Sequence, residues 1–106
     1  MAKYMILAHY TADGAKGLVR EGGSARRKHI GELVERLGGR LESFHFAFGE
    51  VDAYVTVDLP DVTAAIALSL AVNQSGGVHI SAVPLIPPEA LDGATQKTVA
   101  YRAPGH

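Results

Sequence analysis

The pattern of apolar and polar positions along the chain predicts four β-strands. Each segment is rich in apolar, β-branched or aromatic side chains, and residues with turn chemistry bound it. The predicted strands are residues 4–11, 40–48, 52–58 and 78–85. If Gly49 and Glu50 form a two-residue hairpin turn between the second and third strands, His45 lies opposite Tyr54.

Two segments have helical patterns. Ser24 stands at the expected N-cap of the first, which Gly38-Gly39 ends, and its stripe of apolar side chains consists of Ala25, Ile30, Leu33, Val34 and Leu37. Asp61 is the expected N-cap of the second helix, residues 62–73, whose Ala and Leu content predicts that it is nearly buried. Residues 15–23 contain three glycines and are expected to form a short helical turn and a loop.

The polar side of the first helix carries four charged residues that are expected to face water: Arg26, Arg27, Glu32 and Glu35. The basic run at residues 24–28 has two readings. It is either an anion site at a helix N-terminus or, more commonly, a solvated face.

The element order β-α-β-β-α-β predicts an α+β, ferredoxin-like fold. In that fold a four-stranded antiparallel sheet has the strand order 4-1-3-2, and two helices cover one face. Residues 1–87 form the expected domain, and residues 88–106 form a tail in which Pro87-Pro88 can open a short helix. Two helices leave the other face of the sheet uncovered, so a partner, most simply a second copy in a homodimer, is expected there.

Composition narrows the class of protein. The chain has 106 residues, 47% of them hydrophobic, with a formal net charge of −1, which suits one folded domain and argues against nucleic-acid binding. Without cysteine it cannot form disulfides or thiolate metal sites. The longest apolar-rich stretch, residues 62–72, is about half the length of a bilayer span, so no membrane partner is expected. The N-terminal segment is interpreted as a strand and not as a signal peptide, so a cytoplasmic protein is expected.

Three segments carry a family resemblance. Residues 4–14 combine an apolar strand with a Thr-x-x-Gly turn, residues 48–55 form a Gly-containing hairpin, and an Ala/Leu-rich helix precedes Gly77-Val78. Together they resemble the GYD-domain family over residues 4–86. Gly49 and Asp52 match the signature, whereas Val51 replaces its tyrosine. The resemblance implies a ferredoxin-like fold of the dimeric α/β-barrel type in small bacterial proteins, and it implies no activity.

Candidate chemistry gathers at one end of the predicted sheet. The strand order places five residues there: His9, His45, Asp52, Tyr54 and His79. In a small-molecule pocket, His45 or His79 would act as general acid or base, Asp52 would orient a histidine, and Tyr54 would donate a hydrogen bond. These four are the candidate catalytic residues.

Two other interpretations of the same residues stay open. His9, His45 and His79, with or without Asp52, would bind Zn²⁺, Cu²⁺ or Fe²⁺, although no sequence motif with metal-ligand spacing is present. Alternatively, the histidines and Tyr54 line a dimer interface, and Asp52 binds backbone N–H groups of the hairpin.

The sequence therefore predicts a small homo-oligomer that binds a small molecule or is a cofactor-free enzyme, with its pocket near residues 49–54. The alternatives are a non-catalytic oligomerisation module and a histidine-based metal-binding protein. No cofactor, substrate or reaction follows from the sequence.

Overall fold

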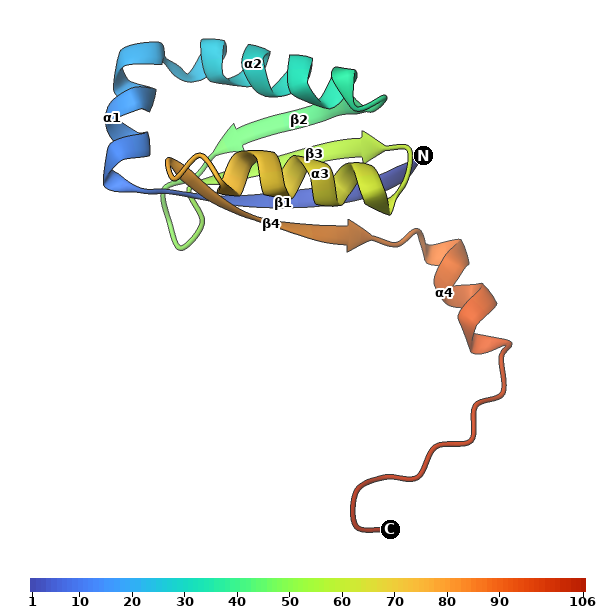
Figure 1. The fold of residues 1–106 in the computed structure, drawn as a ribbon. Coiled ribbons are helices and arrows are strands. Elements are labelled where there is room, and N and C mark those ends of the chain that lie inside the picture. Colours follow the sequence, from blue (N-terminus) through green and yellow to red (C-terminus); the bar gives the residue numbers. More distant parts are fainter.

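A four-stranded antiparallel sheet forms one layer of the structure, and helices α2 and α3 form a second layer on one of its faces (Figure 1). The computed structural model describes all residues from 1 to 106. The elements along the chain are β1 (Ala2–Tyr10), α1 (Ala12–Glu21), α2 (Gly23–Arg36), β2 (Arg40–Phe46), β3 (Ala53–Leu59), α3 (Val62–Asn73), β4 (Val78–Leu85) and α4 (Pro88–Thr95). The sheet order β2-β3-β1-β4 is the predicted order read from the other edge, so the predicted α+β fold is confirmed.

The core lies between the sheet and the helices. Alternate residues of β1 and β3 point into it, among them Ile6, Ala8, Val55 and Val57, all of which are buried. In the hairpin of β2 and β3, His45 lies opposite Tyr54, as predicted. This register matters because a shift of one residue would move every side chain of a strand to the opposite face.

The segment predicted as a turn and loop is a complete helix, so that prediction is wrong. Thr11 is the N-cap of α1: its hydroxyl oxygen accepts a hydrogen bond from the Gly14 N–H, at 3.1 Å. The Thr11 N–H donates to the Gly77 carbonyl oxygen at 3.0 Å, which connects the start of α1 to the loop before β4. Gly22, with φ of 89°, separates α1 from α2 and stands where Ser24 was expected to cap the helix.

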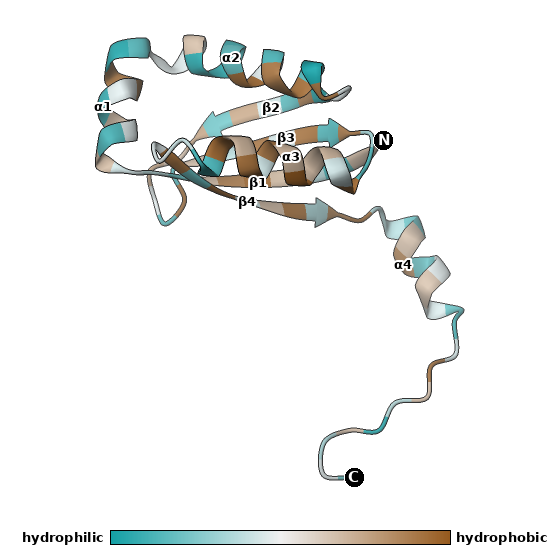
Figure 2. Ribbon diagram, in the orientation of Figure 1, coloured by the Kyte–Doolittle hydropathy of each residue, from teal (hydrophilic) through white to brown (hydrophobic).

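Helix α3 begins as predicted, since the Asp61 carboxylate accepts a hydrogen bond from the Ala64 N–H at 2.9 Å. The prediction that the helix is nearly buried is wrong, because its outer side, with Val62, Ile66 and Leu70, is exposed. Figure 2 shows how apolar the helix is. No charged residue occurs between Val62 and Asn73.

The two edges of the sheet differ from regular ladders. On β4, the Ile80 N–H donates to the Asn73 side-chain oxygen at 2.7 Å, and the Asn73 amide donates to the Ile80 carbonyl at 3.3 Å. On β2, the register shifts between Leu41 and Ser43, which places a bulge at Glu42. The sequence pattern indicated neither feature.

An ion network lies across the end of the sheet that is remote from the predicted chemistry. The Lys3 ammonium is 2.6 Å from the Glu42 carboxylate and 3.7 Å from that of Asp58, and Arg40 is 3.2 Å from Asp58. Hydrogen bonding with Glu42, the charge of Lys3 and the Arg40 guanidinium hold the pKa of Asp58 below its ordinary value. The hydrogen bond to Glu42 raises the pKa of Lys3.

Beyond β4 the chain forms the short helix α4, as the Pro87-Pro88 pair indicated, and then runs on to residue 106 without further regular structure. Figure 1 shows this part projecting away from the two layers. Among the helices, none is both apolar enough and long enough to cross a bilayer.

Candidate functional site

An apolar cavity lies beneath the gap between the two helices of the second layer. Helix α2 packs on β2 and α3 packs on β4, so side chains from both helices and from all four strands surround the central part of the sheet. The cavity volume is about 30 Å³. The cavity is therefore narrow. Its lining consists of Ile6, Ala8, Tyr10, Arg26, Ile30, Phe44, Val55, Val57, Leu68, Val72, Val78 and Ile80.

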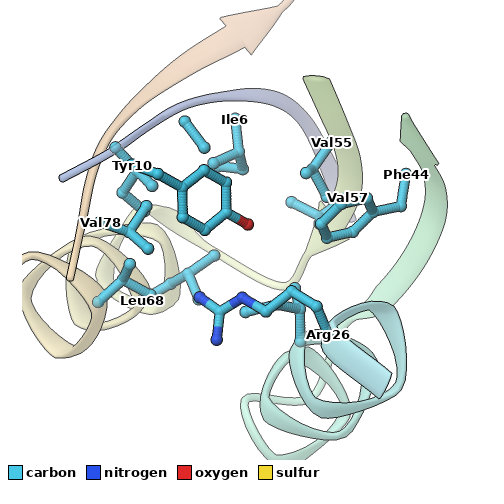
Figure 3. A pocket seen from close by; sticks show the side chains of 12 residues that line it. Ile6, Tyr10, Arg26, Phe44, Val55, Val57, Leu68 and Val78 are labelled. Atoms are coloured by element: carbon cyan, nitrogen blue, oxygen red, sulfur yellow. The ribbon is translucent and has the colours of Figure 1, made fainter. Parts of the chain in front are cut away.

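Arg26 is the one charged residue of this lining, and it reaches in from the first turns of α2 (Figure 3). Its Nε atom is buried and has no hydrogen-bond partner. No carboxylate lies within ion-pair distance of its guanidinium. A guanidinium stays charged at any pH a protein tolerates, and leaving one of its donors buried and unpaired costs free energy. The arrangement suits an anion.

Tyr10 is the second polar side chain of the cavity, and it comes from the last residue of β1. Figure 3 shows its ring and hydroxyl reaching toward the middle of the pocket. Its ring lies 6.4 Å from that of Phe46, centre to centre. The backbone N–H of Tyr10 donates to the Asp52 carboxylate at 2.8 Å, which fixes the end of β1 and so the base of this side chain.

A polar hollow adjoins the apolar cavity at the corner of α1 and α2. Tyr10, Arg26 and Val78 line both spaces, so Arg26 lies at the boundary between them. The hollow adds Asp13, Arg20 and Glu21 of α1. Of these, Glu21 is already 3.2 Å from His29. A molecule whose charged end lies at Arg26 can thus contact the polar residues of the hollow, while its apolar part lies inside the apolar cavity.

The histidines and Tyr54 of the predicted site lie on the other face of the sheet. His45 and Tyr54 are cross-strand neighbours on β2 and β3, and His9 and His79 are neighbours on β1 and β4. All four point away from the helices, because the residues on either side of them in β1, β3 and β4 face the core. The four residues lie toward the same end of the sheet, as predicted. None of the four lines the apolar cavity.

Asp52 does bind backbone, as one of the open interpretations proposed. Its partner is the Tyr10 N–H at the end of β1, and not an N–H group of its own hairpin. No three His, Asp or Glu side chains come close enough together to hold a metal ion. His9 and His79 are paired, but β3 separates His45 from them.

The prediction that Arg26 faces water is wrong, and the sequence contained the signal that identifies it. Arg26 precedes Ile30 by four residues and Leu33 by seven, so all three lie on the same side of a helix. A charged residue on an apolar stripe was the clue. Tyr10 was missed because the apolar character of both faces of β1 hid which one was buried.

The comparisons with known proteins give a family and nothing more specific. No curated protein and no solved structure matches the chain. The family model of the GYD domain matches residues 4–95, which extends beyond the strands to include α4. The chain belongs to the GYD domain family.

Proposed function

We propose that the protein binds a small, largely apolar molecule with one negative charge in the cavity between α2, α3 and the sheet. The observation that carries the proposal is the buried Nε of Arg26, which has no partner within the chain. A carboxylate or phenolate would supply that partner. A carboxylate would accept two parallel hydrogen bonds from the guanidinium, and a phenolate would accept through its single oxygen.

The rest of the lining supports the apolar part of such a ligand. Apart from Arg26 and the hydroxyl of Tyr10, the cavity offers hydrocarbon surface, which favours an aromatic ring or a short branched chain. Its volume of about 30 Å³ is well below the range of about 300–1,000 Å³ that ligand pockets occupy, so the cavity has to widen when a ligand enters. Because α2 and α3 pack on different strands, a small outward shift of α2 would widen it.

The cavity supports binding better than catalysis. Arg26 provides charge and hydrogen bonds, and Tyr10 provides one hydroxyl, but the lining contains no carboxylate, imidazole, serine or lysine. The predicted acid–base residues His45, Asp52, Tyr54 and His79 lie elsewhere. An enzymatic role would therefore have to use the other face of the sheet.

The test compares a charged with an uncharged probe of the same shape. Benzoate should bind the wild type, as followed by amide chemical shifts in NMR titration, and benzyl alcohol should bind markedly more weakly. Arg26→Ala should weaken benzoate about tenfold or more, since a hydrogen bond to a charged group contributes about 1.5–3 kcal/mol. It should leave benzyl alcohol little changed.

Arg27→Ala is the matched control, because Arg27 is the neighbouring arginine on α2 and is exposed. It should bind benzoate as the wild type does. Equal affinity for the two probes, or equal loss in the two arginine variants, would contradict the proposal.

A second role, as a homodimer that pairs the open faces of two sheets, rests on a different observation. The face away from the helices carries Met5 and Leu7 on β1, Val83 on β4 and Tyr54 on β3, and no part of the chain covers it. In such a dimer His45, Tyr54 and His79 would line the interface. The polar site predicted from the sequence would then belong to the assembled protein.

A further inference from the structure

The last part of the chain exposes large apolar side chains that nothing in the molecule covers. We define the C-terminal arm as residues 86–101. Its exposed apolar residues are Ile86, Leu91, Val99 and Tyr101. Leu91 is 63% exposed, and α4 contains no buried residue. Exposed apolar residues in one contiguous segment are typical of a surface that binds a partner.

A second uncovered apolar surface lies on the outer side of α3. A groove runs between this helix and β4, lined by Tyr4, Val62, Ile66, Leu70, Ala82 and Pro84. The side chains of Ile66 and Leu70 are 53% and 65% exposed. A helix that is apolar on all sides is normally buried on all sides. The exposed outer side of α3 is therefore a surface to which another segment is expected to bind.

The arm matches the groove in length and shape. Val62, Ile66 and Leu70 follow each other at intervals of four residues and extend over about 12 Å of helix, which is about the length of the eight-residue α4. On α4, Ala90 and Ala94 flank Leu91, so the large side chain stands between small ones that permit close approach. The match to the family model also includes α4.

The geometry points to the groove of a second copy. Pro87 has φ of −69° and ψ of 153°, and Pro88 follows it, so the connection to β4 is a stiff extended segment. Figure 1 shows the arm leaving the end of β4 in the direction away from α3. We propose that the C-terminal arm of one protomer binds in the α3–β4 groove of another protomer, and that the two copies exchange arms. This exchange uses neither the Arg26 cavity nor the open face of the sheet.

Cross-linking between differently tagged chains tests the exchange directly, because the protein has no cysteine of its own. A full-length chain with Leu91→Cys is co-expressed with a full-length chain with Ile66→Cys and treated with a short bis-maleimide. We expect a cross-linked heterodimer that carries both tags. A chain with Glu35→Cys, an exposed position on α2, replaces the Ile66→Cys chain as the matched control and should give none.

Two results would overturn the proposal. One is equal heterodimer yield from the groove and control positions. The other is a chain with both Leu91→Cys and Ile66→Cys that cross-links only within itself, which would mean that the arm folds onto its own groove. Leu70→Cys, one helical turn along the groove, repeats the test if Ile66→Cys impairs folding as judged by circular dichroism.

Discussion

At the scale of single residues, Gly14 is the position with the least room for a side chain, because the first turn of α1 meets the loop before β4 there. A Cβ atom on Gly14 would overlap the carbonyl oxygen of Gly77. The same loop accepts hydrogen bonds from the backbone and hydroxyl of Thr11. The Thr-x-x-Gly turn, recognised in the sequence as a family feature, therefore has a physical reason: close approach of two backbones.

This reasoning predicts opposite effects of one substitution at two places in α1. Gly14→Ala should lower the free energy of unfolding by about 1–3 kcal/mol or more, because the methyl group displaces the Gly77 loop. Gly17→Ala should raise it by about 0.5–1 kcal/mol, because only the tip of Arg20, at 3.9 Å, lies near and alanine favours a helix. Urea unfolding of the three proteins measures both. Similar stability of the two variants would contradict the account.

The candidate site shows what sequence reasoning reaches at this scale. Asp52 was expected to bind backbone N–H groups, and it does, but only the fold could identify Tyr10 as its partner. Arg26 was assigned to water because arginine usually is exposed. Its spacing to Ile30 instead places it on the apolar side of the helix. That its Nε is buried without a hydrogen-bond partner can be seen only when all neighbouring side chains are placed.

At the scale of elements, the order of strands and helices predicted the fold, and alternation predicted the buried faces of the strands other than β1. It separated Val55 and Val57 from Tyr54 and so determined which face of β3 is buried. Glycine content misled the prediction for residues 15–23, because glycine is typical of loops, whereas here Gly17 lies inside α1 and only Gly22 interrupts the helices. The bulge at Glu42 was missed because a single inserted residue leaves no composition signal.

The ion network across β1, β2 and β3 predicts a pH dependence. The pKa of Asp58 is lower in the folded protein than its ordinary value of 3.8, so its contribution to stability is present above that value and is lost as the pH falls through the folded pKa. The pKa of Lys3 is raised, so its contribution persists below its ordinary value of 10.5 and is lost as the pH rises through the folded pKa.

Thermal unfolding of the wild type and Asp58→Asn between pH 2 and 7 tests the predicted loss of stability at acidic pH. The wild type should have the higher melting temperature near neutral pH, and the difference should shrink below the ordinary carboxyl pKa. A difference that is independent of pH would mean that Asp58 acts through packing and not through its charge.

At the scale of the whole molecule, the structure is less compact than its length suggests. The radius of gyration is 16.9 Å, compared with about 13 Å for a compact chain of this size. The projecting C-terminal arm increases the radius of gyration. The open sheet face and the outer side of α3 add uncovered apolar surface. All three features bear on the two modes of self-association proposed above.

Pairing of the open sheet faces can be tested by sedimentation equilibrium. Val83→Asp places a charge on that face, on the edge strand β4, where Val83 is 41% exposed, so it should shift the dissociation of the wild-type assembly to higher protein concentration. Val19→Asp makes the same chemical change at an exposed position of α1, away from the sheet, and should dissociate as the wild type does. A monomeric wild type, or equal effects of the two variants, would exclude the face-to-face dimer.

The side chain of Asn73 has a consequence for how such assemblies grow. By bonding both the N–H and the carbonyl of Ile80, it occupies one pair of the backbone groups that an incoming strand from another molecule would need on the outer edge of β4. A fifth strand could add there only by displacing the amide. The amide of Asn73 therefore works against open-ended strand addition along this edge, whatever other surfaces of the protein take part in association.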